Sequence, residues 1–356
     1  MSTFFFIPPL GKTSGGLAVL LAMARHLHQA GFPVWLVPRE GLGPFDLAPD
    51  VPILPWDALE LASDDIWLVP EGWPNALAPG LKVAARCVVY CQNWAYLFSS
   101  LPPGVTWDRL NVSFLAVSQP VAWFMEQTLG VKCSVLRPGI DLARFALPEE
   151  KPANVVNIAY MPRKNKALAR QIREIFEARR LPPDVARLAP PIKWIEIAGQ
   201  DQAGVARLLA DAHIFLATGF PEGCPLPPLE AMASGCLPVG FSGFGGWDYM
   251  RQAWNSGLAG NFSPWFPLRP AEETPWQGNG LWTADADTIA AALALAEAAS
   301  WWIRRDPRLA PALVNARRTA QHYGVERQRD RVVELWGQGD LGGAPPSTHL
   351  PIDSNV

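Results

Sequence analysis

The sequence predicts an α/β protein with two domains, each built on a parallel β-sheet. Short apolar runs alternate with helical stretches along most of the chain, and 356 residues are more than one compact core usually holds. Strands that alternate with helices form parallel sheets joined by crossover helices. With 49% hydrophobic and 18% charged residues, the composition is that of a globular protein.

Five apolar runs in the first part of the chain are expected to be strands. They cover residues 4–7, 34–37, 66–69, 87–91 and 114–117. The first run leads into a helix over 17–30, which Gly31 ends because glycine adopts the conformation that closes helices. A further helix is expected to start near Gln119 and Pro120, after the fifth run.

The alternation of strands and helices is interrupted near residue 140. Pro138, Gly139 and Asp141 punctuate the chain there, and residues 147–152 are charged and contain proline. We therefore expect a first domain over 1–140, a linker over 141–152 and a second domain over 153–312. A helix over 313–336 should pack back across the domains, and residues 337–356, rich in Gly, Pro and Ser, should form a disordered tail.

The second domain repeats the pattern of the first. Its expected strands cover 155–160, 192–197, 214–217 and 237–240, and its expected helices cover 167–180, 205–210, 229–234 and 287–301. Residues 263–277 are rich in Pro and Trp and are expected to form a surface loop.

Several classes of function are disfavoured by composition. A net charge of −3 offers no electrostatic basis for nucleic-acid binding. The five cysteines have no C-x-x-C spacing, and we expect reduced thiols in the cytoplasm and no bound metal. No apolar run reaches the length of about 18 residues that a membrane-spanning helix needs, so only peripheral membrane contact stays open.

The most informative segment runs from Pro221 to Gly235 and contains two carboxylates. Glu222 is expected in a loop, and Glu230 on a helix that begins near Leu226, just after Pro225. A helix N-terminus offers N–H groups and partial positive charge to a diphosphate, and carboxylates accept hydrogen bonds from sugar hydroxyls. The alternative is a capped helix whose glutamates are merely solvated.

The run from Glu222 to Gly235 resembles the E-x7-E signature of retaining GT-B glycosyltransferases. The resemblance extends through Pro238 and Val239 to the glycine-rich residues 243–246. It implies two Rossmann-like domains facing a central cleft, with a nucleoside-diphosphate-sugar donor held by the second domain and the acceptor mainly by the first. It further implies that neither a metal nor another cofactor is required.

Within this resemblance, each residue of the segment has an expected role. Glu222 positions the sugar and counts as catalytic, while Pro225, Leu226 and Glu230 bind the donor, Glu230 through its ribose. Polysaccharide or lipopolysaccharide assembly, with a saccharide or glycolipid acceptor, is an expectation drawn from the family alone. The donor base, the acceptor and the oligomeric state are not readable from the sequence.

A basic loop follows the expected strand 155–160. Loops at the carboxyl ends of strands are where α/β sheets bind ligands, and arginine with lysine suits a diphosphate. We therefore expect Arg163 and Lys164 to stabilise the leaving diphosphate. The family places its lysine about one helical turn later, where this chain has Leu168, so Lys166 also stays open as the partner. An ordinary basic helix is the alternative.

The first domain contains two weaker candidate sites. Gly15 and Gly16 follow the first strand, where the resemblance places a turn that faces the donor. Gln92 and Asn93 follow the fourth strand, where amides can bind a sugar or an acceptor but cannot act as a base. A plain turn is the alternative for this second pair.

Three alternatives compete with a nucleotide-sugar-dependent glycosyltransferase of this type. The chain could be a non-catalytic GT-B-like binding module or the partner subunit of an active enzyme. A sugar-nucleotide 2-epimerase is disfavoured because no acid or histidine stands out in the first domain as a catalyst. A glycogen-synthase or phosphorylase-like enzyme is disfavoured by the short first domain.

Overall fold

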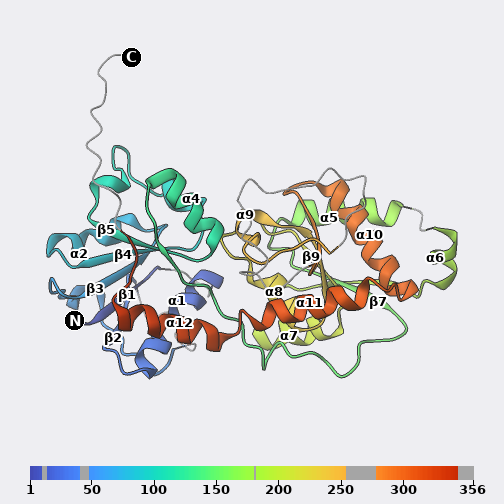
Figure 1. The fold of residues 1–356 in the computed structure, drawn as a ribbon, viewed down its shortest axis with the longest axis horizontal. Coiled ribbons are helices and arrows are strands. Elements are labelled where there is room, and N and C mark those ends of the chain that lie inside the picture. The colour runs from blue at the N-terminus through green and yellow to red at the C-terminus, as the bar shows by residue number, and fades with distance from the viewer. Residues whose placement is uncertain (10–13, 41–47, 180–181, 254–277, 344–356) are drawn as a thin grey trace, which may run out of the picture. The chain divides into compact units, whose positions relative to one another are not determined.

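The chain folds into two compact units. The computed structural model describes residues 1–9, 14–40, 48–179, 182–253 and 278–343, and the statements below concern these residues (Figure 1). Unit 1 comprises Met1–Arg137 with the segment from Gln328 onward, and unit 2 comprises Pro138–Arg327. Each unit contains its own parallel sheet.

The sheet of unit 1 has six parallel strands in the order β2-β1-β3-β4-β5-β6. Every residue of β1 and β3 is buried, as expected for central strands of a sheet that is covered on both faces. The strand order reverses between β1 and β3, and such a reversal leaves a crevice at the carboxyl ends of the strands. The strand bounds are β1 (Thr3–Ile7), β2 (Val34–Pro38), β3 (Ile66–Pro70), β4 (Arg86–Cys91), β5 (Val112–Ala116) and β6 (Ser134–Val135).

The two long helices of the first 137 residues begin at side-chain caps. The Ser14 hydroxyl accepts a hydrogen bond from the N–H of Leu17 at the start of α1, and Ser118 does the same at the start of α4. Serine is favoured at this position because its oxygen satisfies an N–H group that the helix leaves open. The helices are α1 (Gly15–Gln29), α2 (Ala78–Lys82), α3 (Tyr96–Ser99) and α4 (Gln119–Leu129), with 3-10 turns at Trp56–Ala58, Pro74–Leu77 and Trp107–Arg109.

Helix α12 (Val325–Gln338) completes unit 1 although it comes from the end of the described chain. The Trp336 ring stacks on Phe5 of β1 with 6.4 Å between centroids, and its indole N–H donates to the hydroxyl of Thr3 at 3.0 Å. Figure 1 draws this helix in red beside the blue strands of the N-terminal sheet. The core of unit 1 therefore contains side chains that are more than 300 positions apart in sequence.

Unit 2 contains a five-stranded parallel sheet in the order β11-β10-β9-β7-β8. Its strand order reverses between β7 and β9. The strands are β7 (Val156–Tyr160), β8 (Ile192–Glu196), β9 (Ile214–Ala217), β10 (Leu237–Phe241) and β11 (Leu281–Thr283). The helices are α5 (Lys166–Ala178), α6 (Pro183–Leu188), α7 (Gln202–Asp211), α8 (Leu226–Ala233), α9 (Gly243–Gly246), α10 (Thr288–Arg304) and α11 (Leu309–Gln321).

The stretch that the sequence predicted as the linker, 141–152, belongs to unit 2. Phe145 is buried, and the ammonium of Lys151 donates to carbonyl oxygens of Leu209, Ala210, Ala212 and Ser234. These carbonyls lie at the carboxyl ends of α7 and α8, where positive charge is favourable. Burial lowers the pKa of the Lys151 ammonium below its ordinary value.

The end of the chain departs from the sequence prediction in two ways. The expected single helix over 313–336 is wrong, because the chain turns at 322–324 between α11 in unit 2 and α12. The expected disordered tail from residue 337 starts too early, because α12 reaches Gln338 and Leu341 is fully buried. Residues 344–356 and the loop expected at 263–277 lie outside the described residues.

Candidate functional site

The strongest candidate site lies where the strand order of unit 2 reverses. The basic loop, residues 161–165, follows β7, and the acidic loop, residues 218–225, follows β9. The Asn165 amide donates to the carbonyls of Thr218 at 2.7 Å and Phe220 at 3.4 Å, and the Thr218 hydroxyl donates to the carbonyl of Lys164. These bonds hold together two loops that are more than 50 residues apart in sequence.

Asn165 has a conformation that makes this connection possible. Its backbone is left-handed, with φ 60° and ψ 60°, a region in which asparagine is tolerated better than most residues. The residue therefore ends the basic loop, stands directly before α5 and contacts the acidic loop through its side-chain amide. Its role was not expected from the sequence, although an Asn between two lysines just before a helix is a recognisable turn signal.

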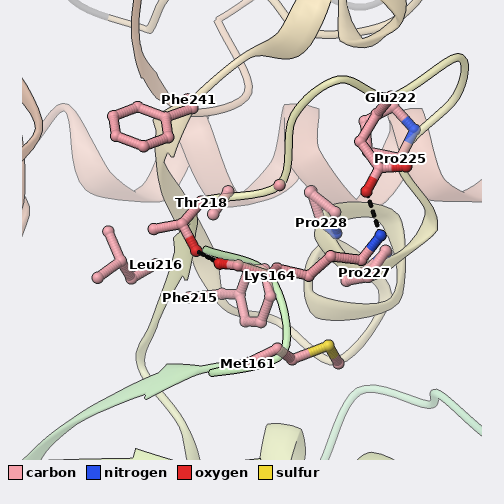
Figure 2. Close-up of a pocket in the computed structure, with 12 residues that line it drawn as sticks. Met161, Lys164, Phe215, Leu216, Thr218, Glu222, Pro225, Pro227, Pro228 and Phe241 are labelled. Atoms are coloured by element: carbon pink, nitrogen blue, oxygen red, sulfur yellow. Dashed lines mark hydrogen bonds and ion pairs between the residues drawn. The ribbon is translucent and has the colours of Figure 1, made fainter. Parts of the chain in front are cut away.

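Lys164 and Glu222, both predicted as catalytic, form an ion pair with each other (Figure 2). Their side chains are 28% and 18% exposed, so solvent reaches the pair but does not surround it. Both line a pocket whose other walls are mainly apolar, from Met161, Phe215, Pro225, Pro227 and Phe241 among others. An incoming anion would compete for the ammonium, and a hydroxyl for the carboxylate.

Arg163 and Glu230 form the second part of this site. Arg163 is exposed at the tip of the basic loop, and Glu230 is half-buried on α8. Burial raises the pKa of the Glu230 carboxyl to about 7, and the charge of Arg163 acts in the opposite direction. Hydroxyl donors from a ligand would favour the ionised carboxyl in the same way.

The start of α8 has fewer N–H donors than the sequence analysis assumed. Pro227 and Pro228 occupy the second and third helical positions and have no N–H, so Leu226 alone provides one among the first three. The Pro225 carbonyl accepts a 2.6 Å hydrogen bond from the hydroxyl of the buried Tyr249, which fixes the entry into the helix. This role of Tyr249 was not expected from the sequence.

The glycine-rich segment after β10, residues 243–246, contacts the backbone of the acidic loop. The N–H of Gly245 donates to the Glu222 carbonyl at 3.0 Å. A Cβ at Gly245 would lie 2.0 Å from the carbonyl oxygen of Gly223, so a side chain there would force the two backbones apart. The position of Glu222 thus depends on a close approach that glycine permits.

In unit 1, the two predicted sites prove to be neighbours. Gly15 and Gly16 begin α1 after β1, and the Gln92 side-chain oxygen lies 2.8 Å from where a Cβ of Gly16 would stand. Gln92 and Asn93 follow β4, as expected. The candidate residues of the first domain therefore form one group at the carboxyl ends of the strands.

A buried carboxylate, Glu71, contacts the backbone of this group. It follows β3 directly, is 4% exposed, and accepts the backbone N–H groups of Gln92 and Asn93 at 3.0 and 2.8 Å. Burial raises its pKa to about 7. Glu71 was not singled out from the sequence, although an acid directly after a fully apolar strand was an available signal.

The sequence also raised expectations about metal ligands, cysteines and membrane-spanning helices. Among the residues that the structure describes, no group of three or more His, Cys, Asp or Glu side chains could hold a metal ion. Each of the five cysteines is free, and Cys133 is the least buried. None of the described helices has the length and apolar character that crossing a bilayer requires.

The chain is similar to a known glycosyltransferase in sequence and to several solved structures in fold. No profile of a known protein family matches the chain. An α-1,6-glucosyltransferase of Actinobacillus pleuropneumoniae serotype 7 (strain AP76) is 28% identical over 192 residues. The match covers 53% of this chain and 56% of that protein, so it spans little more than half of the relative's length.

Three solved structures resemble the chain over nearly its whole length. Sucrose-phosphate synthase from Thermosynechococcus elongatus has a TM-score of 0.60 at 13% identity, covering 95% of this chain and 99% of that one. WaaG, a glycosyltransferase of lipopolysaccharide biosynthesis, has 0.56 at 12%, covering 94% and 99%. A variant of S. aureus TarM in complex with UDP has 0.61 at 9%, covering 95% and 99%.

These similarities establish the fold. The chain has the GT-B architecture of two parallel-sheet α/β domains, which confirms the fold class expected from the sequence. The identities are too low to carry the substrates of these proteins over to this one.

Proposed function

We propose that this GT-B chain is a retaining glycosyltransferase that takes its sugar from a nucleoside-diphosphate-sugar donor. The observation that carries the proposal is the joining of the basic and acidic loops at the strand-order reversal of unit 2. Ligands of open α/β sheets bind at such reversals. The similarity to a glucosyltransferase and to a UDP-bound structure supports the same reading.

The proposed reaction assigns a role to each residue of the unit 2 site. The bond between the anomeric carbon and the diphosphate oxygen breaks, and the acceptor oxygen bonds to the same face of the sugar. The acceptor's proton passes to an oxygen of the departing diphosphate. Arg163 and Lys164 stabilise the charge that develops there, and such preorganised groups typically contribute about a hundred- to a thousandfold each in rate.

The carboxylates have complementary roles in the proposal. Glu222 accepts hydrogen bonds from hydroxyls of the transferred sugar, and Glu230 accepts them from the ribose. Lys164 is paired with Glu222, and in the proposal the donor replaces this pair with two others: ammonium with phosphate, and carboxylate with hydroxyl. The charge of both groups is then compensated throughout.

The proposal includes no metal, because Arg163 and Lys164 provide the positive charge that a cation would otherwise supply. The acceptor is a saccharide or a glycolipid in polysaccharide assembly. We place the reaction in the cytoplasm, in keeping with the free state of the five cysteines. Chelation with EDTA should leave turnover unchanged.

The first test is the thermal stability of the full chain with UDP, GDP, ADP and dTDP, in EDTA and then with magnesium. A ligand that binds only the folded state raises the melting temperature by mass action. We expect one nucleotide to raise it in EDTA, and Arg163→Ala and Glu230→Ala to abolish the rise. Arg170→Ala, which removes an exposed arginine paired with Glu174 on α5, is the matched control and should leave the rise intact.

The corresponding sugar nucleotide then serves as the substrate for turnover. Release of nucleoside diphosphate with the anomeric configuration kept in the product supports the proposal. Inversion of the configuration would contradict a retaining mechanism. If no nucleotide changes the melting temperature and no sugar nucleotide is consumed, the chain is instead a non-catalytic module of the GT-B fold.

A further inference from the structure

Glu71 lies where the strand order of unit 1 reverses. It follows β3 directly, and the neighbouring strand β1 leads to Gly15 and Gly16 at the start of α1. Ligands of parallel α/β sheets bind at the carboxyl ends of the strands that flank such a reversal. The carboxylate thus lies at the position in this sheet where a binding site is expected on topology alone.

The contacts of Glu71 are directed at one turn. One carboxylate oxygen accepts the N–H of Gln92 at 3.0 Å, and the other accepts the N–H of Asn93 at 2.8 Å. The backbone carbonyl of Glu71 accepts the hydroxyl of Ser100 at 2.8 Å, so its main chain is held as well. The Asn93 side-chain oxygen accepts the N–H of Ala95, which leads into α3.

The hydrogen bonds to Glu71 fix the backbone from which the Gln92 and Asn93 side chains extend. Because both backbone N–H groups are held by one buried carboxylate, the turn has little freedom to rotate. Gln92 packs against the backbone of Gly16, where the missing side chain leaves it room. Two amides, which together can donate and accept hydrogen bonds, are therefore presented beside the first turn of α1.

Burying this acid is unfavourable by itself. Glu71 is 4% exposed, and loss of solvent raises its pKa to about 7 although both backbone N–H groups act in the opposite direction. A surface turn could satisfy the same two N–H groups with water. Because the buried carboxylate holds both N–H groups, it fixes the geometry of the Gln92–Asn93 turn, and a binding site requires such a fixed geometry.

We propose that Glu71 is a positioning residue that holds the Gln92–Asn93 turn so that the two side-chain amides bind the hydroxyls of a sugar. The inference rests on the proposed function, which supplies two such sugars: the one that is transferred and the one that accepts it. Both present neighbouring hydroxyls, the chemistry that paired amides recognise. Glu71 itself does not touch either sugar.

Asp65 offers a matched control at the other end of the same strand. It precedes β3, is 8% exposed, and accepts the backbone N–H groups of Ser2 at 2.7 Å and Ala62 at 2.9 Å. Its carboxylate therefore accepts the same number and kind of hydrogen bonds as that of Glu71, but at the amino end of β3, away from the carboxyl ends where a ligand is expected. A purely structural role for Glu71 predicts that both acids behave alike.

The test compares Glu71→Gln, Glu71→Asp and Asp65→Asn in the full chain. The readouts are nucleoside-diphosphate affinity, amide hydrogen exchange of Gln92 and Asn93, and turnover of UDP-glucose and ADP-glucose. Turnover is measured in water alone and with maltotriose or N-acetylglucosamine added. Glutamine can accept only one of the two N–H groups at Glu71, whereas aspartate keeps both acceptor oxygens.

We expect Glu71→Gln to speed hydrogen exchange at the turn and to lower kcat/KM by about ten- to a hundredfold, with nucleoside-diphosphate affinity unchanged. Glu71→Asp should recover part of the loss, and Asp65→Asn should lower the melting temperature without lowering kcat/KM. A loss already present in water identifies the transferred sugar as the one bound. A loss seen only with added saccharide identifies the acceptor.

Two outcomes overturn the inference. One is a Glu71→Gln chain with faster exchange at the turn and wild-type turnover in every arm. The other is an Asp65→Asn chain that loses as much turnover as Glu71→Gln, which would reveal a general stability effect. Failure of the proposed function is distinguishable, because none of the four nucleoside diphosphates would then raise the melting temperature of the wild-type chain and no sugar nucleotide would be consumed, and the role of Glu71 would fall with it.

Discussion

Glu71 and Glu230 are two carboxyls whose pKa is raised by burial. Loss of solvent raises the pKa of each carboxyl to about 7. The opposing influences differ, since Glu71 accepts two backbone N–H groups whereas Glu230 faces the charge of Arg163. The backbone N–H groups stay next to Glu71, whereas the exposed side chain of Arg163 can move away from Glu230. Of the two, Glu230 is therefore the carboxyl whose environment a ligand can change.

His213 makes the stability of the fold depend on pH. It is buried, its Nδ1 accepts the N–H of Asn157 at 3.1 Å, and its ring meets Trp302 edge-on at 4.8 Å. Burial first, and then the charge of Lys151, lower its pKa to about 4. The unfolded chain, with a histidine pKa of about 6.5, binds more protons between these values, so the free energy of unfolding falls as pH falls through this window.

The expected loss from His213 alone is about 3 kcal/mol between pH 6.5 and pH 4. Urea unfolding at pH 7 and pH 4.5 measures it, and His213→Gln should reduce the difference between the two conditions. His28→Gln, at a half-buried histidine of α1, should leave the difference as it is. An unchanged difference in His213→Gln would contradict the role given to His213.

At the scale of elements, Lys151 joins the segment before β7 to the carboxyl ends of α7 and α8. Four carbonyl oxygens accept from its ammonium. Lys151→Met removes the donor and leaves these oxygens partly unsatisfied in a buried place. We expect the free energy of unfolding of unit 2 to fall by about 3 kcal/mol, measured by chemical denaturation.

Lys193→Met is the control for this change, because Lys193 is an exposed residue of β8. It should change stability by less than about 0.5 kcal/mol. Equal effects of the two substitutions would show that the four carbonyls are satisfied by solvent when the ammonium is removed.

Two kinds of sequence pattern predicted elements correctly. One is the apolar run, such as residues 4–7 in β1 and all of β9, and the other is a helical repeat over many residues, as in α10. Strands β6 and β11 have two and three residues, too few for any period. The turn at 322–324 was missed because helical residues continue on both sides of it.

The candidate site was predictable to the extent that its residues carry their own chemistry. Arg163, Lys164 and Glu222 were expected from residue type, loop position and the resemblance to the E-x7-E family, and the structure joins the last two directly. Glu71 and Asn165 act through backbone groups of distant loops. Which loops those are depends on strand order, and strand order is set by packing of the whole sheet, not by any local pattern.

At the scale of the whole molecule, the two units differ in how the chain builds them. Unit 2 is continuous over Pro138–Arg327, whereas unit 1 needs the segment from Gln328 onward. We expect residues 138–327 expressed alone to fold and to keep the nucleotide-dependent rise in melting temperature. Residues 1–137 alone should lack a cooperative thermal transition, because α12 and Leu341 bury apolar surface in this unit.

A fusion of residues 328–343 to residues 1–137 through a flexible linker is the control for the isolated piece. It restores Val332, Leu335 and Trp336 to the core and should recover a cooperative transition, measured by circular dichroism. A cooperative transition of residues 1–137 without this segment would mean that α12 only covers a unit that is already complete.

The return of α12 to the first sheet also orders events during synthesis. A ribosome produces residues 1–137 first, yet Trp336, which stacks on Phe5, leaves the exit tunnel only after all of unit 2 has been made. Domains generally fold as units in the order in which they emerge. Here the unit that starts first is completed last, so the surface of β1 that Trp336 covers lacks this partner throughout translation of the second unit.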